Sequence, residues 1–135
     1  MANDLTDADY AALADFRFSL RSFLAFSESK ATECGLTPQQ HQALLAIRAA
    51  PDGTATVGYV AERLILKPHS ATGLVSRLEA LGMVRRFSSS EDRRQALLAL
   101  TDKAHALLAE LSATHMQEIL RVRPLLIDLL GKMER

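Results

Sequence analysis

Apolar residues recur at helical spacing through most of the chain, and polar breaks divide them into segments. The first segment predicts a helix over about residues 8–30. Phe18 and Phe26 fall off its main apolar stripe, so we expect this helix to be buried on more than one side, as in a dimer. The stripe itself consists of Leu13, Phe16, Leu20, Phe23 and Leu24.

Three shorter helices are predicted in the middle of the chain. A capping box at Thr37 and Gln40, with Pro38 at the first helical position, begins one that ends near the turn at Pro51. Helices over about 57–66 and 68–81 follow, with Ile65 among the inward-facing residues of the first. Because only a few residues separate these two helices, we expect a tight helix-turn-helix.

A hairpin and a long helix complete the pattern. Residues 83–87 and 95–100 predict two strands around a polar turn, and Gly82 is the expected end of the preceding helix. Thr101 caps a long apolar helix that Pro124 is expected to bend or break. The fold class is therefore mainly α with a small β-hairpin.

Composition indicates an ordinary globular domain. The chain has 135 residues, of which 48% are hydrophobic and 24% are charged, which suits a single core. No apolar run approaches the roughly 18 residues of a membrane span, and the acidic start does not resemble a secretory signal. Cys34 is the only cysteine, which excludes an internal disulfide and fits a reducing cytoplasm. We therefore expect a cytoplasmic protein.

The net charge is zero, but the charges are unevenly distributed. Residues 59–95 contain seven basic and four acidic side chains, whereas residues 1–35 contain three basic and six acidic ones. A basic middle and an acidic start favour one face that meets phosphates and another that avoids them.

The fourth predicted helix has the polar face that a DNA-recognition helix needs. Short polar side chains lie opposite its core stripe, and its N-terminus favours a phosphate. Gly73 sits mid-helix, where it either permits close approach to DNA or removes a base contact. The candidate DNA-binding residues of this helix are Lys67, His69, Ser70, Thr72, Gly73, Ser76 and Arg77.

The hairpin carries a second basic cluster. Arg93 and Arg94 occupy its polar turn, where an arginine can enter the narrow minor groove of DNA. Asp92 is close enough in sequence to orient Arg94 by a charge-assisted pair. Arg85 and Arg86, at the base of the hairpin, are expected to contact phosphates.

The tight helix pair "VAERLILKPHSATGLVSRLEALGMVRR" and the hairpin "SSSEDRRQALLALTDKA" together resemble the MarR family of transcriptional regulators. The resemblance runs over about residues 36–111. It implies a winged helix-turn-helix lobe over about 36–101 and dimerisation helices over about 8–30 and 102–135. It further implies a homodimer that binds a palindromic duplex operator. Arg94 would then lie in the minor groove, and Asp92 would orient its guanidinium. Repression is the commoner role in the family.

The resemblance also implies a small aromatic or acidic effector, bound between the dimer helices and the DNA-binding lobe. Arg17 or Arg21 is placed to pair with its carboxylate, although solvation or a structural ion pair is the ordinary role of such residues. The candidate pocket residues are Phe16, Arg17, Leu20, Phe23, Leu24 and His41.

Three other functions stay open. Cys34 and the histidines leave a peroxide- or metal-sensing regulator of the same fold, although Cys34 has no second cysteine to resolve it and His41, His105 and His115 lack the tight spacing of a zinc site. A winged helix can also serve as a protein-interaction module. An enzyme is disfavoured, because the sequence contains neither HExxH nor GxSxG and no phosphate-cradling glycine loop, and we expect no cofactor or bound metal.

Overall fold

The computed structural model describes residues 4–88 and 96–132. Within them, the structure is mainly helical with one two-stranded antiparallel sheet, which confirms the predicted fold class. The elements are α1 Asp7–Glu33, α2 Pro38–Ala49, α3 Val57–Leu64, α4 Pro68–Ala80, β1 Val84–Ser88, β2 Ala96–Leu100 and α5 Asp102–Lys132.

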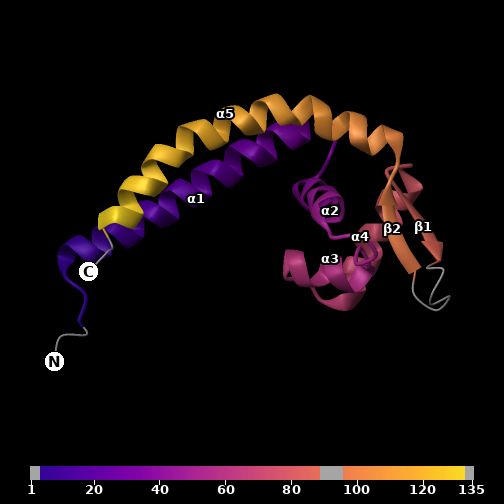
Figure 1. Ribbon diagram of the computed structural model, residues 1–135, viewed down its shortest axis with the longest axis horizontal. Coiled ribbons are helices and arrows are strands. Elements are labelled where there is room, and N and C mark those ends of the chain that lie inside the picture. Colours follow the sequence, from indigo (N-terminus) through magenta and orange to yellow (C-terminus); the bar gives the residue numbers. More distant parts are fainter. Residues whose placement is uncertain (1–3, 89–95, 133–135) are drawn as a thin grey trace.

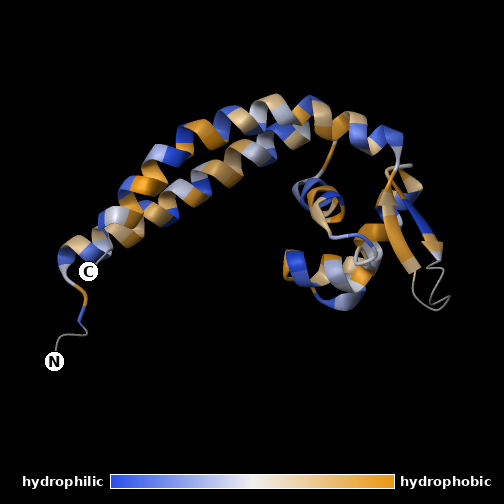
Figure 2. Ribbon diagram, viewed as in Figure 1, coloured by the Kyte–Doolittle hydropathy of each residue, from blue (hydrophilic) through white to orange (hydrophobic). Residues whose placement is uncertain are grey.

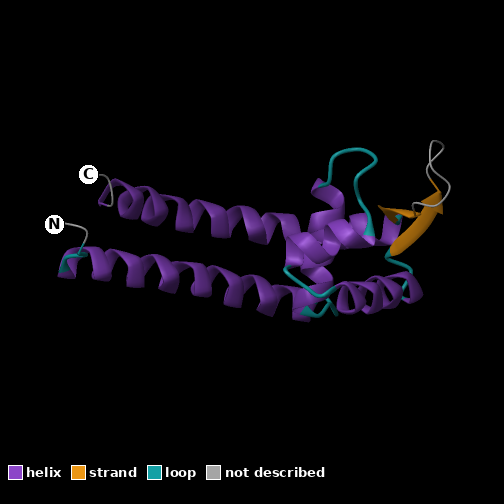
Figure 3. Ribbon diagram, turned by 90° about the horizontal axis from the view of Figure 1, so that it is seen from below, coloured by secondary structure: helices purple, strands orange, loops and turns teal. Residues whose placement is uncertain are grey.

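The two long helices and the short elements occupy different parts of the molecule. In Figure 1, α1 and α5 run side by side as an arched arm, and α2, α3, α4 and the hairpin form a lobe at one end of it. The turned view in Figure 3 shows the same division. Pro124 does not break α5, which continues to Lys132, so of the two expected outcomes the break is absent and the bend stays a prediction. Pro124 is exposed, where the loss of one backbone N–H is tolerated most easily.

Local signals in the sequence set most of the helix boundaries. At the start of α2, the backbone N–H of Gln40 donates to Thr37 Oγ1 at 3.1 Å, and that of Thr37 donates to Gln40 Oε1 at 3.0 Å. The capping box is therefore confirmed. Gly82 adopts a φ of +73° immediately after α4, which is the left-handed conformation that ends a helix.

The turn between α3 and α4 contains residues 65–67 and is as short as predicted. Ile65 has φ +56° and ψ +51°, a left-handed conformation that is uncommon for a β-branched residue. This turn points the Ile65 side chain into solvent, where it is 92% exposed, so the prediction that it faces inward was wrong. The backbone N–H of Leu66 donates to the Ala61 carbonyl at 2.8 Å and closes the helix end.

The core lies mainly in the lobe. The sheet adds to it through the pairing of Val84 with Leu100, and the Leu98 N–H donates to the Ala55 carbonyl at 2.7 Å, which ties β2 to the segment before α3. The side chains of α2, α3, α4 and the hairpin therefore pack into one core. Its largest fully buried side chains are Leu44, Leu74, Leu78, His41, Val60 and Val75.

The arm leaves a large apolar surface uncovered. Figure 2 shows hydrophobic residues along much of both α1 and α5. Such a contiguous apolar surface on a folded chain typically marks an interaction site. Its exposed members include Phe18, Leu20, Leu24, Met116, Ile119, Leu120, Leu125, Ile127 and Leu130. Over residues 4–88 and 96–132, no helix combines the length and apolar character needed to cross a membrane.

Candidate nucleic-acid interface

Helix α4 separates its polar and apolar residues onto opposite faces. The buried face consists of Ala71, Leu74, Val75 and Leu78, which pack into the core of the lobe. The structure places six of the seven predicted recognition residues in solvent and Gly73 at an intermediate depth. The exposed six are Lys67, His69, Ser70, Thr72, Ser76 and Arg77.

The N-terminus of α4 is open. Lys67 is the N-cap residue and makes no side-chain capping hydrogen bond, and Pro68 occupies the first turn. Thr72 donates its hydroxyl to the Pro68 carbonyl at 3.0 Å, so it does not cap the helix either. Free backbone N–H groups and the Lys67 charge therefore lie at the same helix end, an arrangement that attracts a phosphate.

Gly73 lies beneath the Arg77 side chain. A Cβ built at Gly73 would lie 3.4 Å from Arg77 Nη1, an ordinary van der Waals distance, so the guanidinium rests over the glycine one helical turn earlier. A methyl group would fit at position 73 without displacing Arg77. The contact explains why Gly73 is partly buried on an otherwise exposed face.

The β1–β2 hairpin, which is the wing of the predicted winged helix-turn-helix, is attached to α4 at its base. Arg86 Nε donates to Glu79 Oε1 at 3.0 Å, and Arg86 Nη2 donates to Ser76 Oγ at 3.5 Å. Arg85, its neighbour on β1, is exposed and lies over the Phe87 ring at 5.4 Å. The two arginines predicted as phosphate contacts therefore differ: Arg86 is engaged by α4, whereas Arg85 rests on an aromatic face of its own strand.

The wing tip lies outside the described residues. It includes Asp92, Arg93 and Arg94, so their predicted positions are not tested.

The predicted effector residues do not come together. Phe23 and Leu20 line hollows between α1 and α5, whereas Phe16 and Arg17 line neither of those two hollows. His41 is fully buried in the lobe, where its ring stacks on that of His115. Leu24 is exposed on α1.

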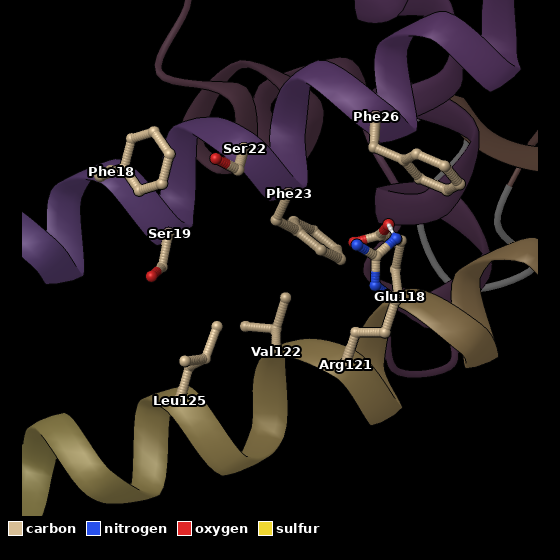
Figure 4. A pocket seen from close by; sticks show the side chains of 9 residues that line it. All are labelled: Phe18, Ser19, Ser22, Phe23, Phe26, Glu118, Arg121, Val122 and Leu125. Atoms are coloured by element: carbon tan, nitrogen blue, oxygen red, sulfur yellow. Dashed lines mark ion pairs between the residues drawn. The ribbon is translucent and has the colours of Figure 1, made fainter.

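One hollow between α1 and α5 combines aromatic and charged side chains. It has a volume of about 330 Å³, and Phe23 of α1 points across it toward Val122 of α5 (Figure 4). Phe18, Phe26 and Leu125 also line it. Glu118 is buried, and its Oε1 lies 3.5 Å from Nη1 of the exposed Arg121. The sequence offered one signal for this site, because Glu118 follows the buried Leu111 by seven residues and so falls on the same helix face.

Cys34 and the histidines do not form a metal centre in the described part of the chain. Cys34 is half-buried at the C-terminus of α1 and packs against the core. Over residues 4–88 and 96–132, no group of three or more His, Cys, Asp or Glu side chains could hold a metal ion.

Comparison with known proteins identifies the lobe. Residues 35–95 match the MarR family model. The HTH-type transcriptional repressor MdtR of Bacillus subtilis (strain 168) is 29% identical over 105 residues, 75% of this chain and 66% of MdtR. The HTH-type transcriptional regulator TtmR of Methylorubrum extorquens (strain PA1) is 36% identical over 105 residues, 78% of this chain and 49% of TtmR. The chain therefore spans less than two thirds of the length of either relative.

Solved structures show the same fold. S. aureus MepR, determined in a complex with DNA, superposes with a TM-score of 0.68 at 18% identity, covering 90% of this chain and 85% of MepR. The agreement extends beyond the lobe to the long helices, since it covers most of both chains. The family match assigns residues 35–95 to the MarR family, the two curated relatives are regulators of the same type, and the superposition with MepR shows that the chain shares its fold.

Proposed function

We propose that the protein is a sequence-specific, double-stranded DNA-binding transcriptional regulator that acts as a repressor. The observation that carries this proposal is the polar face of α4, which is exposed opposite a buried apolar face and has an open N-terminus beside Lys67. Such a helix fits the major groove, while the basic hairpin next to it meets the phosphates. The names of MdtR and TtmR, a transcriptional repressor and a transcriptional regulator, support the same role.

The active species is a homodimer joined through the arms. An exposed apolar surface on both α1 and α5 fits a second copy of this chain, because a dimer would remove it from water. A two-fold axis would present two α4 helices to two half-sites, which accounts for a palindromic operator.

Duplex binding tests the DNA-binding role. Affinity for the region upstream of the protein's own gene should fall steeply with salt, because phosphate contacts release counterions. Arg77→Ala should weaken specific binding by about 1–3 kcal/mol, the value of a good base-edge contact. Arg21→Gln, an exposed arginine on α1, is the matched control and should bind as wild type. A folded dimer that binds no duplex at low salt would contradict the proposal and favour a protein-interaction module.

Sedimentation tests the dimer. Ile127→Glu places a carboxylate on the exposed apolar face of α5 and should produce monomers at concentrations where wild type is dimeric. Gln117→Glu adds the same charge at an exposed polar position of α5 and should leave the dimer intact. Equal masses for wild type and Ile127→Glu would contradict assembly through the arm.

The effector site is proposed for the hollow between α1 and α5. Three phenylalanines supply an apolar lining, and the exposed Arg121 can turn from Glu118 toward a carboxylate, so a small aromatic acid fits. Calorimetry with benzoate as the probe should show binding that Arg121→Gln weakens and Arg17→Gln, on the exposed side of α1, does not. Equal benzoate affinity in wild type and Arg121→Gln would remove the effector from this hollow.

A further inference from the structure

Two histidines meet where the lobe joins the arm. His41 on α2 and His115 on α5 stack with ring centroids 4.9 Å apart and an angle of 7° between the rings. Their Nε2 atoms lie 3.1 Å apart, within hydrogen-bond distance. Because one nitrogen must donate and the other must accept, this contact fits two neutral rings.

The surroundings of His41 restrict where its proton can be. The ring is fully buried, and its Nδ1 has no hydrogen-bond partner among the described residues. A proton on Nδ1 would be a buried donor without an acceptor, which costs more than a bare lone pair. His41 is therefore assigned as the Nε2–H donor and His115 as the acceptor.

This assignment makes the contact sensitive to acid. A proton added to His115 Nε2 brings two N–H groups face to face, and moving the His41 proton to Nδ1 would strand it in the core. Protonation of both rings would place two positive charges in a stack. Burial first, and the neighbouring His115 second, hold the pKa of His41 below its ordinary value.

A second contact between α2 and α5 also requires a neutral histidine. Arg48 Nη1 on α2 lies 2.6 Å from His105 Nδ1 on α5. Arginine can only donate, so Nδ1 must carry a free lone pair and His105 must be neutral. Protonation of His105 would replace this hydrogen bond with a repulsion between two cations, which solvent weakens because both side chains are exposed.

The acidic side chains of the helices packed around the joint are themselves paired or exposed. On α1, Glu33 pairs with Lys30 at 3.4 Å, and on α5, Glu118 pairs with Arg121 at 3.5 Å. The charged residues of α3, Glu62 and Arg63, are exposed. Within residues 4–88 and 96–132, the structure gives neither His41 nor His115 an acidic partner.

Protons can reach the contacts from solvent. A hollow of about 390 Å³ opens between α2 and α5, and Arg48, His105 and His115 all line it. Helix α2 in turn packs against α4 and β2 as well as α5. A change at this joint is therefore transmitted to the recognition helix.

We propose that the α2–α5 joint, formed by His41 with His115 and by Arg48 with His105, is an acid-sensitive switch that releases the lobe from the arm. The joint is closed when all three histidines are neutral. In mildly acidic solution it opens, α2 loses its support on α5, and the two recognition helices of the dimer lose their fixed spacing. The consequence for DNA rests on the proposed function, whereas the opening itself does not.

Hydrogen exchange on the free dimer tests the opening. Protection factors in α2, corrected for the pH dependence of the chemical rate, should fall about tenfold between pH 7.5 and pH 5.5. The variant His115→Phe with His105→Gln keeps an aromatic ring beside His41 but removes both imidazole partners, so its protection should fall less than that of wild type, by the part that burial of His41 alone causes. His69→Gln, an exposed histidine of α4, is the matched control and should follow wild type.

DNA affinity supplies the second readout. Wild type should lose about tenfold in affinity over the same pH range, and the double variant less than twofold. Constant protection in wild type, or an equal loss in the double variant, would overturn the switch. If the double variant does not fold, the imidazole proton resonances of wild type decide. Exchange in α2 must rise together with a change in the chemical shifts of the joint's imidazole protons, and a rise without that change overturns the proposal. If the protein binds no DNA at any pH, the proposed function is contradicted. Hydrogen exchange then still tests whether the α2–α5 joint opens in acid.

Discussion

Glu79 Oε1 accepts a 3.0 Å hydrogen bond from Arg86 Nε, and this ion pair joins the C-terminal part of α4 to the first strand of the wing. Both side chains are about one-third exposed, at 41% and 32%, so the pair is only partly screened by water. The pair fixes the angle between two elements that are proposed to enter neighbouring grooves. It also neutralises an arginine at the edge of the proposed DNA surface.

Glu79→Gln should therefore increase duplex affinity at low salt. The substitution removes a negative charge and frees Arg86 for a phosphate, so the dependence of log K on log salt should steepen by about one unit. The cost in folding stability should stay below about 1 kcal/mol, as for other exposed ion pairs. Fluorescence anisotropy over a salt series measures the slope. Glu110→Gln, an exposed carboxylate on α5, is the control, and an unchanged slope in Glu79→Gln would show that Arg86 does not reach DNA.

Ile65→Gly should stabilise the protein. Ile65 has a φ of +56° and is 92% exposed, so it bears the cost of the left-handed conformation and buries almost nothing in return. Glycine adopts that conformation freely, and the expected gain is about 1 kcal/mol in the free energy of unfolding. Urea denaturation measures it. Gly82→Ala, at φ +73°, is the reverse change and should lower the midpoint; a lower midpoint for Ile65→Gly would show that the isoleucine makes a stabilising contact.

Much of the fold could be predicted from local signals in the sequence. The capping box at Thr37, the short connection before Pro68 and the glycine after α4 each act within a few residues, and each is confirmed. The prediction for Ile65 was wrong, because the left-handed backbone after α3 points this apolar side chain into solvent. Pro124 was expected to bend or break the last helix, and the break is absent, because α5 continues on both sides of it.

The site was only partly predictable for a different reason. The polar face of α4 could be predicted from the helical periodicity of the sequence, because residues three and four apart lie on the same face of a helix. The stack of His41 on His115 joins residues 74 positions apart, and the contact of Arg48 with His105 joins residues 57 apart. The periodicity of a sequence does not indicate contacts between residues so far apart, so these contacts could be found only in the tertiary structure.

Arg94→Ala should weaken operator binding by about 1–3 kcal/mol, the scale of a good base contact. This prediction rests on the sequence alone, because Arg94 lies outside the described residues. A narrow minor groove attracts arginine, so the loss should be larger on an operator with A·T-rich flanks than on one with G·C-rich flanks. Competition binding with the two duplexes measures the difference, and Arg21→Gln is again the control. An equal loss on both duplexes would assign Arg94 to a phosphate.

Acid should destabilise the fold through His41. Burial, and then His115, hold the pKa of His41 below its ordinary value near 6.5, so the unfolded chain binds more protons than the folded one over the interval between the two pKa values. The free energy of unfolding is therefore greatest above pH 6.5, falls as the pH drops from 6.5 to the folded-state pKa, and levels off below it, with a total loss of about 1.4 kcal/mol for each unit by which the pKa is lowered. Urea denaturation at pH 7.5, 6.5 and 5.5 measures this loss in wild type. His41→Leu fills the buried position with a side chain that cannot titrate, so it should lose less stability over the same range, while His69→Gln should match wild type. Equal losses in His41→Leu and wild type would show that the buried imidazole is not the group that acid attacks.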